Sequence, residues 1–219
     1  AGIERHPDSR DLHQWVHLSR RVSHSIKKTT ETGGFFMPML CPCIRQEDTQ
    51  MTDWPLAQSY RFNGHNVRYA VRGDGPPLVF VHGTPFSSFV WHRIAPHFIA
   101  THRVYYFDLL GYGQSEKVDG DVSLGVQNQL LAQLLEHWGL DRPDVVAHDF
   151  GGATALRSHL LNGKDYRSLT LIDPVALTPW VSPLVQHVRQ YEAAFSGVPD
   201  YIQRAIVAAY IRGAIKRDI

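Results

Sequence analysis

Short apolar runs that alternate with helix-like stretches constrain the fold of this chain more than any other feature. The runs occupy residues 77–81, 103–107, 144–147 and 168–172. Apolar runs of this length, bounded by turn residues, are typical of strands buried on both faces of a sheet. Strands that alternate with helices form parallel sheets covered by helices on both faces. The sequence therefore predicts an α/β fold around a mostly parallel sheet.

The segments around these runs predict one hairpin and three helices. An Asn63-Gly64 pair between two alternating segments is a hairpin signal. Leucines at helical spacing predict a long helix over residues 124–138. Shorter helices are expected around residues 89–98 and over residues 151–161.

The charge balance excludes several kinds of partner. The 22 Lys and Arg against 21 Asp and Glu give a formal net charge of +1, and residues 51–219 carry fifteen of each sign. Such a neutral body offers no electrostatic footprint to nucleic acid or to an anionic membrane. Neither a membrane span nor an apolar leader is recognisable, and Cys41 and Cys43 lie too close together to staple the fold. We therefore expect a cytoplasmic protein without a nucleic-acid or membrane partner.

The strand at residues 144–147 leads directly into a helix through a turn with one acidic residue. Asp149 stands at that turn, with the small residues Ala147 and Gly151 two positions away on either side. This spacing fits a nucleophile elbow, a strained strand-to-helix turn that needs small neighbours to present one side chain. A carboxylate so placed can attack carbon and form a covalent ester. The alternative is that Asp149 only caps the helix.

A second strand end carries the motif His82-Gly83-Thr84-Pro85. In a fold with such an elbow, the loop at this strand end donates one oxyanion N–H, and the residue after the nucleophile donates the other. The predicted donors are the backbone amides of Thr84 and Phe150. We expect His82 to brace the loop, and the Thr84-Pro85 bond is a candidate cis peptide. An ordinary turn is the alternative for the motif taken alone.

Residues 80–91, 108–115 and 147–152 together resemble the α/β-hydrolase superfamily. The HGTP and HDFGG segments are most similar to its aspartate-nucleophile branch, the epoxide hydrolases and haloalkane dehalogenases. The resemblance implies that Asp149 forms an alkyl-enzyme ester with a small apolar organic substrate, and that a histidine then activates water to hydrolyse the ester. Thr84 and Phe150 take the oxyanion positions. No cofactor is implied, and the 13 histidines show no metal-ligand spacing, so no metal is expected.

Two positions depart from the dehalogenase pattern. Dehalogenases that resemble this chain usually carry a tryptophan directly after the nucleophile, whose indole N–H holds the leaving halide, and many carry an asparagine where Thr84 stands. Phe150 has no N–H donor on its ring, so the epoxide hydrolases are favoured over the dehalogenases. In epoxide hydrolases two cap tyrosines protonate the ring oxygen; Tyr191, Tyr201 and Tyr210 are candidates. A non-catalytic relative that only binds a small apolar ligand is a third alternative.

Asp173 directly follows the strand at residues 168–172. Some dehalogenases place there the acid that orients the catalytic histidine, so the resemblance makes Asp173 a candidate for that role. The alternative, of equal weight, is that the Asp173-Pro174 pair only starts a turn.

The resemblance also divides the chain. Residues 1–56 are expected to be an N-terminal tail, non-native or disordered, residues 57–180 part of the hydrolase core, and residues 181–219 the beginning of a helical cap. Apolar stripes predict two cap helices, over residues 185–195 and 202–215. In the family, two further strands and the catalytic histidine follow the cap. We therefore expect a fragment of a longer protein that lacks this histidine and is not competent for turnover.

Overall fold

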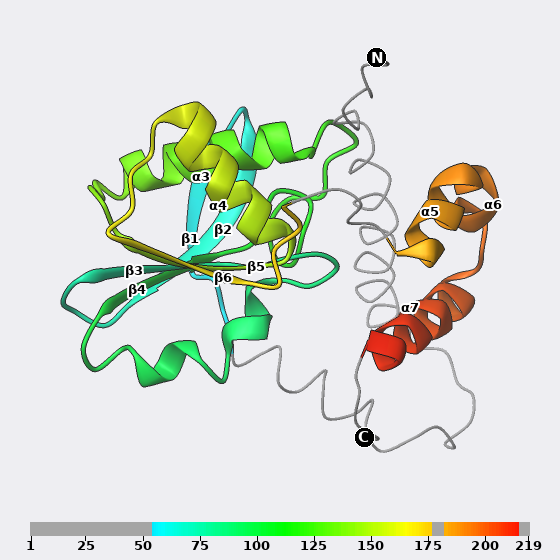
Figure 1. The fold of residues 1–219 in the computed structure, drawn as a ribbon, viewed down its shortest axis with the longest axis horizontal. Helices are drawn as coiled ribbons and strands as arrows, with labels where there is room; N and C mark the ends of the chain where they lie inside the picture. The colour runs from blue at the N-terminus through cyan, green and yellow to red at the C-terminus, as the bar shows by residue number, and fades with distance from the viewer. Residues whose placement is uncertain (1–53, 177–181, 215–219) are drawn as a thin grey trace, which may run out of the picture.

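The computed structural model describes residues 54–176 and 182–214, so the expectations for residues 1–53 of the N-terminal tail, including Cys41 and Cys43, lie outside these ranges, whereas Trp54 and Leu56 at its end are buried in the core. Within them, six strands form one mixed sheet in the order β1-β2-β4-β3-β5-β6 (Figure 1). The strands are β1 (Gln58–Phe62), β2 (His65–Arg72), β3 (Pro77–Val81), β4 (Arg103–Phe107), β5 (Asp144–His148) and β6 (Ser168–Ile172). Strands β4, β3, β5 and β6 pair in parallel, while β1 and β2 are antiparallel. The α/β fold with a mostly parallel sheet is confirmed.

The predicted hairpin joins β1 to β2. Asn63 and Gly64 both have positive φ, 48° and 86°, and Phe62 pairs with His65 across the turn. Positive φ at both central residues is the requirement of a type I′ turn, and the Asn-Gly pair meets it with little strain. The local sequence therefore fixes this turn and its register.

Helices cover the two faces of the sheet unequally. α3 (Leu124–His137) and α4 (Phe150–Asn162) lie on one face, and two short 3-10 helices, η1 (Ser88–Trp91) and η2 (Ala95–His97), lie on the other (Figure 1). The sequence predicted a helical stretch around residues 89–98, and the structure divides it into these two short helices. Pro96 lies in the first turn of η2, and its missing N–H cannot continue a helix from η1.

Two apolar cores result, one on each face of the sheet. Val79 and Phe107 point into the core beneath α3 and α4, whereas Phe80 and Tyr106 point into the core that contains Trp91. Consecutive residues of a strand point to opposite faces, so a strand with both faces covered needs a continuous apolar run. This is why the strands could be located from the sequence.

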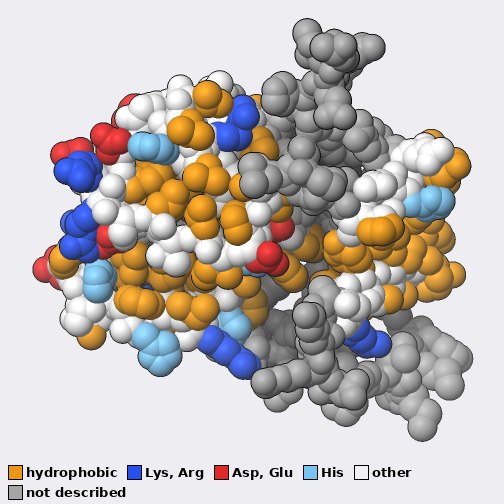
Figure 2. Space-filling view, viewed as in Figure 1, with side chains coloured by type: hydrophobic (Ala, Val, Ile, Leu, Met, Phe, Trp, Pro, Cys, Tyr) orange, Lys and Arg blue, Asp and Glu red, His pale blue; other side chains and the backbone are white. Residues whose placement is uncertain are grey.

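β6 is the exception, because it forms one edge of the sheet among the described residues. The sequence predicted a buried strand, but the side chains of β6 are half-buried or exposed, with Ile172 41% exposed. A strand is buried only when a neighbour and a covering layer enclose it, and apolar content alone does not supply either. Leu160 and Leu161 at the end of α4 are exposed as well, and Figure 2 shows apolar side chains on the surface of this part of the molecule.

The last described segment is helical. It consists of α5 (Pro183–Gln190), α6 (Glu192–Ser196) and α7 (Asp200–Ala214). The predicted helix over residues 185–195 is divided at Tyr191, which has non-helical angles of φ −123° and ψ 39°, whereas α7 matches its prediction closely. None of the helices in the described ranges combines the length and the apolar character that crossing a membrane requires.

Candidate active site

Asp149 lies in the turn between β5 and α4 with a backbone conformation that L-residues rarely adopt. Its angles are φ 51° and ψ −121°. Backbone bonds hold it there: its N–H donates to the Ile172 carbonyl (3.1 Å), and its carbonyl accepts from Gly152 N (2.9 Å) and Val175 N (3.2 Å). Such a conformation costs about 1–3 kcal/mol and persists where the surroundings enforce it.

Glycines make room for this turn. A Cβ added at Gly151 would overlap the carbonyl oxygens of Val81 and His82, and one added at Gly83 would overlap the side chain of Asp149. The backbones of β3 and of the Asp149 turn therefore approach one another more closely than any larger residue would allow. The small residue at position 151, noted in the sequence, has this physical reason.

The Asp149 carboxylate turns away from its helix and toward the loop after β3. Its Oδ2 accepts a hydrogen bond from the backbone N–H of Thr84 (2.8 Å), and it makes no side-chain capping bond to α4. Burial raises the pKa of Asp149, while the N–H groups of Phe150 and Thr84 act in the opposite direction. The helix-cap alternative is therefore not what the structure contains. The structure brings Asp149, Thr84 and Phe150 together.

The loop after β3 is held by a contact that the sequence did not signal. The Thr84-Pro85 peptide is cis, as the sequence suggested. The Thr84 hydroxyl lies 2.8 Å from the hydroxyl of Tyr112, whose ring lies against Phe150 with centroids 6.5 Å apart. Tyr112 belongs to the Gly-rich turn after β4, and only its place in that turn could have suggested that it lies near the site. A partly buried hydroxyl pair thus lies beside the donor that holds the Asp149 carboxylate.

Asp173 lies in the turn after β6, next along the sheet edge from Asp149. It has φ 45° and an exposed side chain, and its negative charge adds to the rise of the Asp149 pKa. His148 acts in the opposite direction on that pKa, and its ring meets Trp91 edge-on at 6.4 Å between centroids. Within residues 54–176 and 182–214, no histidine is hydrogen-bonded to Asp149 or to Asp173.

Two further observations concern metal ions and the candidate proton donors. Residues 54–176 and 182–214 contain no group of three or more His, Cys, Asp and Glu side chains arranged to hold a metal ion. Tyr191 and Tyr201, two of the candidate proton donors, have exposed side chains. Nothing in the geometry selects one of the candidate tyrosines.

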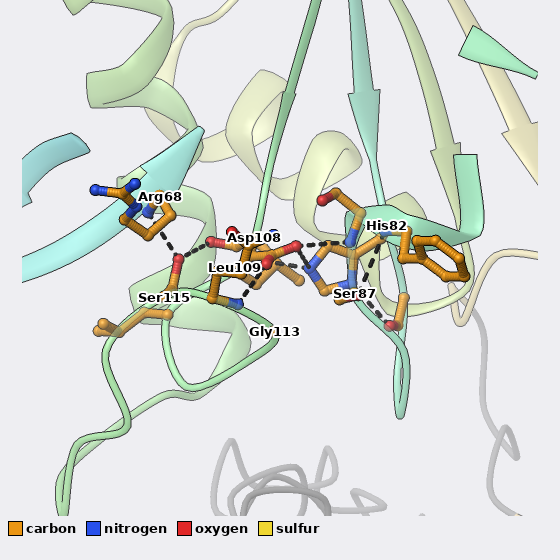
Figure 3. A network of polar contacts seen from close by, with 12 residues as sticks. Arg68, His82, Ser87, Asp108, Leu109, Gly113 and Ser115 are labelled. Carbon is orange, nitrogen blue, oxygen red and sulfur yellow. Dashed lines mark hydrogen bonds and ion pairs between the residues drawn. The ribbon is translucent and has the colours of Figure 1, made fainter. Parts of the chain in front are cut away.

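A second aspartate, Asp108, directly follows β4, at the same end of the parallel strands as Asp149, and Figure 3 shows the network around it. Its Oδ1 accepts from Ser88 N (2.7 Å) and its Oδ2 from Gln114 N (2.6 Å), while its carbonyl accepts from the Ser115 hydroxyl (2.6 Å). The side chain is 1% exposed. Both carboxylate oxygens are engaged in fixing the loops, a role that sequence reasoning did not assign to Asp108.

The fold and this arrangement agree with the comparisons to known proteins. The family model described as "alpha/beta hydrolase fold" matches residues 76–207. The chain belongs to this family.

Individual similar proteins match parts of the chain. The chain is 34% identical over 93 residues to a soluble epoxide hydrolase of Corynebacterium sp. (strain C12), covering 42% of this chain and 32% of that protein. It is 31% identical over 112 residues to a haloalkane dehalogenase of Agrobacterium fabrum, covering 51% of this chain and 37% of that protein. A crystal structure of an alpha/beta hydrolase fold protein from Burkholderia ambifaria is 54% identical, with a TM-score of 0.73, covering 76% of this chain and 62% of that one. The matched region spans about a third of the curated relatives.

Proposed function

We propose that this chain carries the nucleophile of a hydrolase that forms a covalent alkyl-enzyme ester on Asp149, with epoxides as the preferred substrate class. The observation that carries the proposal is the Asp149 turn: a half-buried carboxylate on a strained backbone, with one oxygen bound by the Thr84 N–H (2.8 Å). Two backbone donors at a carboxylate can hold the oxyanion of a later tetrahedral intermediate. Relatives named for epoxide and haloalkane hydrolysis support this class of chemistry.

The proposed first step is a substitution at carbon. Because the Thr84 N–H holds Oδ2, the other carboxylate oxygen attacks a ring carbon of the epoxide. A C–O bond forms to Asp149 as the ring C–O bond breaks, and the ring oxygen takes a proton from a cap tyrosine or from water to become a hydroxyl. The product is a hydroxyalkyl ester of Asp149.

Hydrolysis of that ester needs a base that activates water. We place this base on a histidine outside the described residues, with Asp173 as a candidate for the acid that orients it. Water then attacks the ester carbonyl, the two backbone donors hold the oxyanion, and a diol is released with Asp149 restored. In this proposal residues 57–180 form part of the core and 181–219 begin the cap of a longer, cytoplasmic enzyme, and this chain alone stops at the ester.

Mass spectrometry with styrene oxide tests the first step. We expect one added epoxide mass on the peptide that contains Asp149, and none in Asp149→Asn. An unchanged adduct in the variant would refute the nucleophile assignment. Reversible binding with no adduct, unaffected by the substitution, would favour a non-catalytic relative.

Haloalkane dehalogenation is the second candidate, because a dehalogenase of Agrobacterium fabrum is among the relatives. Phe150 lacks the side-chain N–H that would stabilise a leaving halide. We therefore expect styrene oxide to alkylate the chain faster than 1-bromobutane does. Faster halide release from the haloalkane would reverse the order of the two candidates.

A further inference from the structure

His82 is fully buried and hydrogen-bonded at both ring nitrogens (Figure 3). Nε2 lies 3.0 Å from the backbone N of Leu109, and Nδ1 lies 2.9 Å from the carbonyl oxygen of Gly83. A backbone N–H can only donate, so Nε2 must be the bare acceptor; a carbonyl can only accept, so Nδ1 must carry the proton. The two partners together define a neutral ring in one tautomer.

The bond to Leu109 connects two loops near the carboxylate of Asp149, and the bond to Gly83 stays within the loop after β3. Gly83 precedes Thr84, whose N–H holds Asp149 Oδ2 at 2.8 Å. Leu109 follows Asp108, whose carboxylate is fixed by Ser88 N and Gln114 N. The His82 ring therefore joins the oxyanion loop to the loop that the Asp108 carboxylate anchors. Its hold acts one residue away from the donor to Asp149.

The space around Gly83 leaves the loop little freedom to adjust. A Cβ at Gly83 would overlap the Asp149 side chain, so the Gly83 backbone already lies in contact with the carboxylate group. A displacement of this backbone moves both the contact and the following Thr84 N–H. Small displacements at a catalytic group are costly, because the reacting atoms must be held in narrow geometry.

The charges that face the ring come from three segments. Asp108 Oδ1 lies 4.0 Å from Nε2, and His148 at the end of β5 and Lys117 beyond the Gly-rich turn act from further away. Burial, the largest cause, lowers the pKa of His82, while Asp108 acts to raise it. Protonation would place an N–H at Nε2 against the Leu109 N–H, two donors with no acceptor between them.

We propose that His82 is a positioning residue of the ester-forming step, acting as a neutral ring with its proton on Nδ1 that clamps the Gly83-Thr84 loop to Leu109. The Nε2 acceptor is the essential half of the clamp, because it alone joins the two loops. This inference rests on the proposed function, in which Asp149 is the nucleophile.

Two substitutions separate the halves of the clamp. In His82→Gln the side-chain oxygen falls near the place of Nε2 and can accept from Leu109 N–H; in His82→Asn the amide nitrogen falls near Nδ1 and the acceptor is lost. We expect the first-order rate of Asp149 alkylation at saturating styrene oxide to stay within about 3-fold of wild type in His82→Gln and to fall roughly 10- to 100-fold in His82→Asn. The half-saturating concentration should change little in either. Equal rates in both variants and wild type would overturn the proposal. A change in His82→Asn that affects only the half-saturating concentration of styrene oxide, with the saturated rate unchanged, would overturn it as well.

A measurement on the unaltered chain makes the test independent of how the variants fold. ¹⁵N spectra of isotope-labelled protein should show the His82 ring, assigned by through-bond correlations from its own backbone, with a protonated Nδ1 and a bare Nε2 at neutral pH. A proton on Nε2 would overturn the proposal. If wild type forms no adduct on Asp149 while the ring shows the expected tautomer, the proposed function fails rather than the hydrogen-bond assignment.

Discussion

Two aspartates follow β4 and β5 at the same end of the sheet, with β3 between the two strands, and their surroundings differ in a way that separates structure from chemistry. Asp108 follows β4 with both carboxylate oxygens bonded to backbone N–H groups. Asp149 follows β5 at φ 51°, with its Oδ2 bonded to the Thr84 N–H. The loops at Asp108 are stabilised by their aspartate, whereas the turn at Asp149 is strained in order to present one.

The difference arises from the residues that follow each strand. After Asp108 a Gly-rich turn folds back, so that the N–H of Gln114 reaches the carboxylate. Gly113, at φ 45°, permits this approach because a Cβ there would overlap the Asp108 carboxylate. After Asp149 the helix α4 begins at once, and Gly151 packs against the backbone of β3. An exchange of roles between the two aspartates would contradict this account.

Removal of the Asp149 charge should have the largest effect on rate. We expect Asp149→Asn to lower alkylation by styrene oxide on the order of 10⁴-fold or more, the size seen when a nucleophile or its partner is removed. Asp108→Asn keeps an oxygen acceptor and should react far closer to wild type. Single-turnover alkylation followed by mass spectrometry compares the two variants. Equal losses would break the distinction between them.

The tight approach at Gly151 should give the largest effect on stability. Gly151→Ala forces a Cβ into the Val81 and His82 carbonyls, and we expect a loss of about 3 kcal/mol in the free energy of unfolding. Gly213→Ala in α7 is the matched helical control, because nothing lies within 4 Å of its Cβ. That substitution should instead stabilise its helix by about 0.5 kcal/mol. Urea unfolding measures both changes, and similar effects at the two sites would contradict the packing described.

Asp108→Ala should act mainly on stability. It leaves the N–H groups of Ser88 and Gln114 without their charged acceptor, which costs about 2 kcal/mol. Thermal unfolding compared with Asp119→Ala, a substitution at an exposed aspartate of the following loop that should leave stability nearly unchanged, checks this. A stability of Asp108→Ala equal to wild type would show that these bonds do not hold the loops.

The strain at Asp149 predicts a smaller difference between two variants. Asp149→Gly relieves the positive φ, whereas Asp149→Asn keeps most of it, so at neutral pH the glycine variant should be the more stable by about 1 kcal/mol. Both variants lack the charge, so charge does not enter this comparison. Equal free energies of unfolding would mean that the turn is not strained.

The pH dependence should show the smallest effect, a displaced inflection. Alkylation needs the ionised carboxylate, and burial raises the pKa of Asp149 above its ordinary value of 3.8. The rate should therefore fall as pH falls through an apparent pKa above that value. The folded state binds the Asp149 proton more tightly than the unfolded state does. Protonated Asp149 therefore adds to the free energy of unfolding at low pH, and this contribution is lost as pH rises through the folded-state pKa. A rate inflection at or below 3.8 would contradict the burial described.

The sequence allowed prediction of features that depend on neighbours in the chain. The hairpin at Asn63-Gly64, the strands β3 and β4 and the turn at Asp149 all follow from local patterns of apolar and turn residues. The exposure of β6 did not, because burial depends on what covers a strand. The division of the helical stretch around residues 89–98 into η1 and η2 was also not predicted, although Pro96, which lacks an N–H, could have indicated it.

The parts of the candidate site that escaped prediction are tertiary contacts. The Thr84–Tyr112 hydroxyl pair and the His82–Leu109 bond join residues 28 and 27 positions apart, on different strand ends. No periodicity marks such partners, since they meet only after the sheet has brought the ends of β3 and β4 together. Asp108 escaped for the same reason, because its acceptor role depends on two loops at once.

Mapping the site of the covalent adduct tests the central claim most directly. The chain is treated with styrene oxide, digested, and the peptides that contain Asp108 and Asp149 are sequenced by tandem mass spectrometry. The account predicts one epoxide mass on the Asp149 side chain and none on Asp108. An adduct on Asp108, or on both aspartates to the same extent, would contradict it.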